Sequence, residues 1–199
     1  MESHLAVLLP LAAVWLTAGA LADGLPRLDR ARTLRRRTGQ VLALTVAALG
    51  LTAAVGVAGL SADGGTAADR AAAGLALAVV PAGAAAVCAV RRMRRLWAGA
   101  CAFTTAPDTP APHGLRAAAA HPLIGLPVQV TGLAILPAVV ATAMPELVTR
   151  TGAGGPAITV GVLGVAAIGV RHALRHSRLA ERAMPERASA RTAARPLHV

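Results

Sequence analysis

The stretch LIGLPVQVTGLAILPAVVATA, residues 123–143, carries no charged side chain and decides the class of fold. Crossing about 30 Å of hydrocarbon takes roughly 20 apolar residues in a helix. Further uncharged stretches of similar length occupy residues 5–22, 41–60, 71–90 and 154–170. The sequence therefore predicts an all-α, polytopic integral membrane bundle of about five transmembrane helices. We expect a single transmembrane domain over residues 1–184.

The composition supports this prediction. The chain is 55% hydrophobic and 15% charged, whereas a soluble domain carries about 25% charged residues. All 20 basic residues are arginine, a bias that we attribute to the GC-rich genome of a bacterium. The net charge of +11 lies in the connections between apolar stretches. This placement favours anionic lipid headgroups as partners and argues against nucleic acid.

The arginines alternate between connections and so predict the topology. Residues 23–40, 91–122 and 171–199 together hold 18 of the 20, whereas 61–70 and 145–155 hold one each. Because basic loops stay in the cytoplasm, the N-terminus is expected outside and the C-terminus in the cytoplasm of a multi-pass plasma-membrane protein.

A cleaved signal peptide over residues 1–22 is the alternative to a first membrane span. Ala20 and Ala22 precede Asp23 in the manner of a signal-peptidase site. However, Glu2 and the absence of arginine before residue 27 do not fit a signal peptide, and cleavage would place the arginine-rich connections outside. We therefore expect the first stretch to remain as a span.

An amphipathic interfacial segment is expected at residues 93–106. Its apolar side chains recur at helical spacing directly after four arginines. Such a segment either continues the third span as a helix or lies in the membrane interface. Three prolines at 107, 110 and 112 then interrupt it.

The basic segment after the fifth span suggests contacts with lipid headgroups. Arginines recur there at i, i+4, i+7 and i+11, on one stripe of a helix. These candidate headgroup contacts are Arg171, Arg175, Arg178 and Arg182. The alternative is that they act only as a topology signal. Pro185 is expected to end the helix, which leaves residues 185–199 as a flexible, basic cytoplasmic tail.

Small residues and prolines mark where the helices should pack or bend. Glycine and alanine repeat at four-residue spacing in the second, third and fifth spans, which allows close helix approach. The predicted small-residue positions are Gly50, Ala54, Ala58, Gly74, Ala78, Ala82, Ala86, Ala157, Gly161 and Gly169. They serve either internal packing or a dimer face. Kinks are expected at Pro81, Pro127 and Pro137.

The fourth span holds the polar residues Gln129 and Thr131 close to two of these prolines. A transporter would use such a broken, polar region to bind a solute. The alternative is a structural kink in which the glutamine is hydrogen-bonded to another helix. The two interpretations differ in whether a polar cavity reaches Gln129.

The sequence contains no pattern that predicts an enzyme or an ion pump. No ionisable residue lies within the five stretches, and such residues usually mark ion and proton pathways. Zinc-protease, serine-nucleophile and glycine-rich phosphate motifs are absent from the sequence. We therefore predict no catalytic residue.

Histidines near the predicted cytoplasmic face leave one alternative, a metal or haem site. His172 and His176 stand at i,i+4 spacing, and His121 is the plausible partner of His172 for haem. Interfacial histidines among arginines are more commonly solvated, so no cofactor and no metal is expected.

These observations favour a structural or accessory membrane protein without enzymatic activity, which would act as a subunit of a larger assembly. Its expected partners are the lipid bilayer and either a second copy of the chain or another membrane protein. The first alternative is a small permease or exporter subunit that uses the kinked fourth span. The second is a haem- or metal-carrying redox component.

Overall fold

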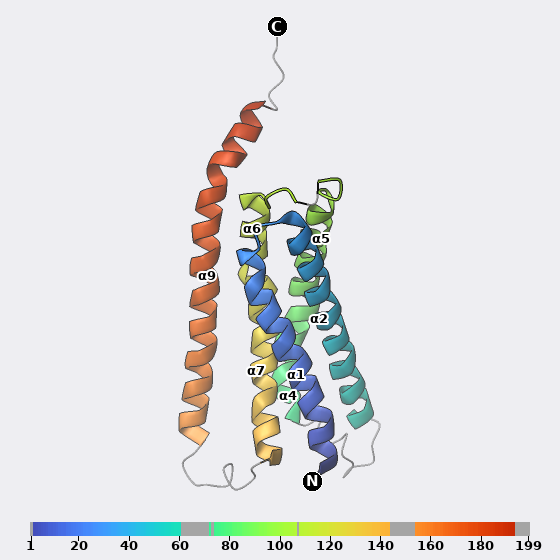
Figure 1. The fold of residues 1–199 in the computed structure, drawn as a ribbon. Coiled ribbons are helices and arrows are strands. Elements are labelled where there is room, and N and C mark those ends of the chain that lie inside the picture. Colours follow the sequence, from blue (N-terminus) through green and yellow to red (C-terminus); the bar gives the residue numbers. More distant parts are fainter. Residues whose placement is uncertain (1, 61–71, 73, 107, 144–153, 194–199) are drawn as a thin grey trace.

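The computed structural model describes residues 2–60, 72, 74–106, 108–143 and 154–193 (Figure 1). For residues 2–4, 60, 142, 154–158 and 185–193 it describes the course of the backbone only. The predicted outer connections 61–70 and 145–155 lie almost wholly outside the described residues, as does the end of the tail, 194–199. Within the described part, the chain is built from helices and short turns.

The first two spans are the helices α1, Glu2–Gly24, and α2, Ala31–Leu60, joined through a short 3-10 turn η1, Leu25–Arg27. The third span is one continuous helical stretch made of three segments. These are α4, Ala76–Ala84, the π-helical turn η2, Ala85–Ala89, and α5, Val90–Cys101.

The second half of the chain forms three more helices. The short helix α6, His113–Ala119, leads into α7, Pro122–Ala143, and the last helix is α9, Gly154–Ala193. Four helical stretches are long and apolar enough to cross a membrane: Leu5–Arg27, Ala31–Gly59, Ala76–Cys101 and His113–Ala141. The fifth predicted stretch, 154–170, forms the first part of α9.

The arginine-rich parts of the chain gather toward one end of the bundle. The end of α1, the start of α2, the end of α5, α6 and the arginine-bearing part of α9 lie toward the same end in Figure 1. Two connections meet there, because the backbone N–H of Ala31 donates to Thr109 O at 3.1 Å and that of Ala111 to Asp29 O at 2.6 Å. Within the described residues, the arginines of the three basic connections thus lie toward one end of the bundle.

The helix α1 lies in the core of the bundle, between α2 and α7. Its buried side chains recur every three or four residues, which keeps them on one face of the helix. These residues are Leu8, Leu11, Trp15, Ala18 and Ala22, with Ala12 beside Leu11. The indole N–H of the fully buried Trp15 donates a hydrogen bond to Thr52 Oγ1 of α2 at 3.1 Å. A polar bond between helices therefore satisfies the one polar atom of this side chain.

The helix α7 packs against α1, α4, η2 and α9. Small residues bring it close to its neighbours, because a Cβ built on Gly74 would lie 2.7 Å from the Cβ of Ala138. Pro127 and Pro137 lie inside α7, Pro81 inside α4, and Pro10, which the sequence analysis did not single out, inside α1. Membrane helices accommodate such prolines when neighbouring groups satisfy the freed carbonyls.

The small-residue prediction is met only in part. Ala78 and Ala82 are buried between α4 and its neighbours, whereas Ala86 is exposed and the buried face passes through Ala85 and Ala89 instead. On α2 all three predicted positions, Gly50, Ala54 and Ala58, face outward. Gly161 is exposed, nothing approaches Gly169 within 4 Å, and Ala157 lies outside the described side chains.

The segment after the third span ends earlier than the sequence predicts, at Cys101, and the last helix ends later. Of the two alternatives for the segment after the third span, the structure has the continuation, in which α5 buries Met93, Leu96 and Ala100. The expectation that Pro185 ends the last helix is wrong, since α9 continues to Ala193. A proline removes one backbone donor and strains one turn, but the hydrogen bonds on either side of it can hold a long helix together. Figure 1 shows α9 bending toward its C-terminal end.

Candidate functional site

Gln129, the polar residue of the fourth span, joins three helices. Its Nε2 donates to the backbone carbonyl of Gly19 on α1 at 3.1 Å. Its Oε1 lies 3.0 Å from Nε2 of His172 on α9. Because an amide oxygen can only accept, His172 donates through Nε2, and its other ring nitrogen carries no proton in the neutral form. The glutamine thus has partners on both sides.

Two glycines make this junction sterically feasible. A Cβ built on Gly19 would lie 2.9 Å from Cγ of Gln129, and one built on Gly125 would lie 2.5 Å from Cε1 of His172. Any larger residue at either position would push the side chains of the junction apart. Glycine at both places therefore lets α1 and α9 approach α7 at the same level of the bundle.

Thr131, the second polar residue predicted in this region, is fully buried. Its hydroxyl donates to the carbonyl of Pro127 in its own helix at 2.7 Å. This bond satisfies the hydroxyl within the proline-containing part of α7. Gln129 and Thr131 are both occupied by contacts within the protein.

Asp23, at the end of α1, is surrounded by arginines. Nη1 of Arg175 lies 2.9 Å from both the backbone oxygen and Oδ1 of Asp23. Arg171 pairs with the same carboxylate, and Nη2 of Arg27 lies 3.9 Å from Oδ2. The Asp23 side chain is only 15% exposed, so these contacts are partly shielded from solvent. Two of the four arginines predicted to contact lipid headgroups therefore bind another helix.

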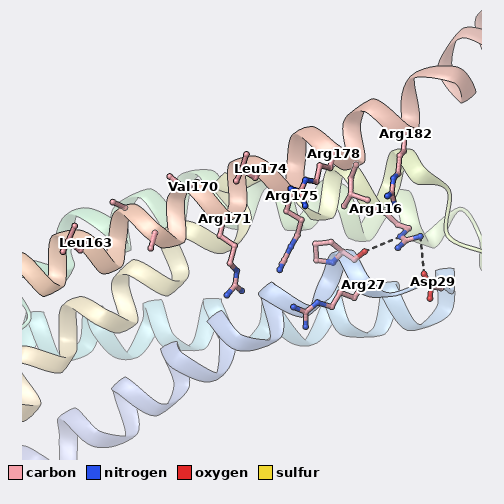
Figure 2. A pocket seen from close by; sticks show the side chains of 14 residues that line it. Arg27, Asp29, Arg116, Leu163, Val170, Arg171, Leu174, Arg175, Arg178 and Arg182 are labelled. Carbon is pink, nitrogen blue, oxygen red and sulfur yellow. Dashed lines mark hydrogen bonds and ion pairs between the residues drawn. The ribbon is translucent and has the colours of Figure 1, made fainter.

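A groove of about 1000 Å³ opens beside these contacts, between α9 on one side and η1, Asp29 and α6 on the other (Figure 2). Its α9 wall is wholly apolar from Leu163 to Val170, and from Arg171 to Arg182 it carries arginines with two leucines between them. The apolar residues are Leu163, Ala166, Ala167, Val170, Leu174 and Leu179, and the arginines are Arg171, Arg175, Arg178 and Arg182. The opposite wall is formed by Pro26, Arg27, Asp29 and Arg116.

The opposite wall is fixed by Arg116 of α6. Its Nε donates to the carbonyl of Pro26 at 3.3 Å, and its Nη1 lies 3.2 Å from Oδ1 of Asp29. Figure 2 shows both contacts as dashed lines, with Arg182 on the facing helix. Arg178 and Arg182 are exposed, and neither has an ion pair with any residue whose side chain the structure describes. The groove can therefore bind an anion next to an apolar surface.

The histidines are arranged differently from the pair that the haem alternative requires. His121 lies beside His176, with ring centroids 4.9 Å apart, whereas His172 is bonded to Gln129. Nδ1 of His121 accepts the N–H of Leu123 at 3.2 Å, and Nδ1 of His176 donates to the carbonyl of Ala117 at 3.1 Å. Among the described residues, no group of three or more metal-ligating side chains comes together.

A smaller cavity of about 360 Å³ lies on the other side of α6. Arg92, Arg95, His121 and His176 contribute to its lining, together with alanine and leucine side chains. Neither this cavity nor the basic groove includes Gln129 in its lining. The polar region of the fourth span is thus separate from both.

Asp23, Gly125 and Arg116 take part in these sites, but the sequence analysis did not select them. Asp23 carried one visible signal, since it is the acidic residue at the boundary of the first apolar stretch and the first arginine-rich connection. Its partners on α9 are Arg171 and Arg175, and Arg175 is 152 residues away in the sequence. No local sequence pattern reaches that far. No sequence pattern identifies Gly125 as the glycine that accommodates His172.

Comparison with known protein families, with characterised proteins and with solved structures gives no match for this chain. Its class therefore follows from its own residues. It is an all-helical protein within the described residues, with four helices apolar enough to cross a membrane and a basic groove beside its last helix.

Proposed function

We propose that this chain is a structural or accessory protein of the bacterial plasma membrane and has no enzymatic activity. It crosses the bilayer five times, with its N-terminus outside and its arginine-rich end in the cytoplasm. The positive-inside rule supports this orientation, because the arginine-bearing segments gather toward one end of the bundle.

The hydrogen bonding of Gln129 is the observation that carries the proposal. A solute pathway would leave this amide facing a polar cavity, whereas here it bonds Gly19 of α1 and His172 of α9. Thr131 is likewise buried and bonded within its own helix. These contacts favour a packed structural junction over the permease alternative.

We propose further that the protein works as a subunit, with a second copy or another membrane protein as its partner. The outward-facing small residues of α2 support this, because Gly50, Ala54 and Ala58 share one face that no described helix covers. Purification in mild detergent should retain one partner in fixed stoichiometry. Recovery of a lone monomer under every mild condition would count against the subunit role.

Cysteine accessibility separates the accessory role from transport. Cys88 and Cys101 are first replaced by serine, and cysteine is then introduced by Gln129→Cys or Thr131→Cys. A charged thiol reagent should label neither position in sealed vesicles of either orientation, and both after unfolding in a strong detergent. Leu174→Cys is the positive control, because Leu174 is 52% exposed in the groove. Labelling at 129 or 131 in the folded protein would instead support a water-filled solute pathway.

A further inference from the structure

We propose that the groove beside α9 binds one anionic phospholipid, with its phosphate groups among the arginines and an acyl chain along Leu163, Ala167 and Val170. This inference goes beyond the accessory role, because it names a ligand class and a site, and it holds whether or not the chain also transports a solute. The division of the groove into an apolar part and a basic part is its main support.

The charge of the groove requires an anionic occupant. Six arginines line it, and the carboxylates available to them are Asp29 in the lining and Asp23 behind it. An excess of four positive charges remains. Arg178 and Arg182, which face no described acid, are the two best placed to bind a phosphate, and guanidinium groups bind phosphate in a bidentate manner.

The apolar half of the groove requires an occupant with a hydrocarbon chain. Leu163 and Val170 are 63% and 59% exposed on the protein surface, so both can contact a hydrocarbon chain. Ala166 and Ala167 lie between them and leave space at the wall because their side chains are small. Since α9 packs mainly on α6 and α7, and meets α1 through Arg171 and Arg175 at Asp23, the apolar wall that precedes Arg171 is left for another molecule.

A phospholipid matches both halves in the correct order. Its chain lies in the hydrocarbon where the apolar residues of α9 lie, and its phosphate lies at the interface where the arginines begin. A free phosphate or an acidic peptide would use the arginines but leave the apolar wall uncovered. The four excess charges favour a lipid with two phosphates, of the cardiolipin class, over one with a single phosphate.

The test uses the full-length protein, purified, stripped of lipid and titrated with lipids of defined headgroup by native mass spectrometry. We expect cardiolipin to bind most tightly, phosphatidylglycerol less tightly and phosphatidylcholine least. The double substitution Arg178→Gln with Arg182→Gln should weaken cardiolipin binding on the order of 30-fold, from the usual contribution of two interfacial basic residues.

A matched pair of controls separates a defined site from general attraction. Arg32→Gln with Arg36→Gln removes the same charge from exposed positions on α2 outside the groove, and should change the affinity less than threefold or so. An equal loss in both double variants would overturn the proposal, because it would show attraction to the charged end as a whole.

A second pair of variants tests the chain-binding half without changing charge. Ala167→Trp fills the apolar wall and should displace the lipid, whereas Val162→Trp, on an exposed face of α9 outside the groove, should not. Full binding to Ala167→Trp would overturn the placement of the chain. Competition by soluble glycerol phosphate as strong as by cardiolipin would identify a free-phosphate site instead. The protein could instead prove to be a dimer without bound lipid, and the double variant Arg178→Gln with Arg182→Gln could dissociate it. That result would identify a second copy of the chain as the occupant and overturn the lipid site.

Discussion

Asp23 of α1 and Arg175 of α9 are 152 residues apart in the sequence, and they are joined by two 2.9 Å contacts at the arginine-rich end of the bundle. Arg175 reaches both the backbone oxygen and the carboxylate, which fixes the guanidinium more firmly than a single ion pair would. Together with the bond between His172 and Gln129, this contact holds α9 against the other helices.

Replacing this carboxylate should loosen the last helix. Asp23→Asn keeps the size of the side chain but leaves Arg171 and Arg175 without their acid, which should cost on the order of 1–3 kcal/mol. We expect a lower midpoint of thermal unfolding in detergent. Asp29→Asn is the control, because Asp29 is 78% exposed and pairs only with Arg116 among the described residues, so its loss should cost less than about 1 kcal/mol. Equal shifts in both variants would contradict the special role of Asp23.

The glycine that faces His172 should be sensitive to a single added methyl group. Gly125→Ala places a Cβ 2.5 Å from the imidazole, and overpacking of this kind typically costs about 1–3 kcal/mol. Gly83→Ala adds the same atom at an exposed position of α4, where a built Cβ meets nothing within 4 Å, and should be neutral or slightly stabilising. Thermal unfolding of both variants checks the prediction. An unchanged midpoint for Gly125→Ala would mean that α9 does not approach α7 at this position.

The third span should tolerate bulk on one face only. Ala82 is 6% exposed where α4 and η2 pack against α7, so Ala82→Leu should destabilise the bundle by about 1–3 kcal/mol. Val79 is 61% exposed, and Val79→Leu should have almost no effect. Thermal stability of the two variants in the same detergent compares them directly. Equal stability would argue against the buried face of α4.

The hydrogen bond between Trp15 and Thr52 offers a spectroscopic test of helix packing. Thr52→Val leaves the buried indole N–H without its partner, at a cost of about 0.6–1.7 kcal/mol for a membrane interior. With Trp97→Phe as background, the emission of Trp15 should shift in Thr52→Val. Thr45→Val is the control, because Thr45 bonds only the Val41 carbonyl of its own helix among the described contacts. If the emission spectrum of Trp15 is unchanged in both Thr52→Val and Thr45→Val, the hydrogen bond between Trp15 and Thr52 is contradicted.

The helical, membrane-like character of the chain and the location of its apolar helices follow from the sequence, because apolar length is a strong local signal. The stretch 123–143 became α7, Pro122–Ala143, with nearly the same bounds. The ends of the other helices were harder to predict, because α2 and α9 continue through arginines where hydropathy no longer distinguishes helix from loop. The helix-breaking effect of Pro185 was overestimated for a different reason. One missing backbone donor does not end a long helix.

The candidate groove was predictable only on the α9 side. The spacing of Arg171, Arg175, Arg178 and Arg182 was visible, but their roles differ according to what faces them. Arg171 and Arg175 meet Asp23, and Arg178 and Arg182 meet the open groove. Such long-range pairing depends on how the helices pack, and local periodicity carries no information about it.

The sidedness of the chain tests the central claim of five crossings most directly. Reporter fusions are made after Gly39, Gly114 and the C-terminus, and after Gly64 and Gly154, in cells that distinguish cytoplasmic from external reporters. The first three fusions should report the cytoplasm and the last two the outside, because the arginine-rich connections alternate with arginine-poor ones. A cytoplasmic reporter after Gly64 would contradict the five-crossing account, since the second and third spans could then not both cross the membrane as proposed.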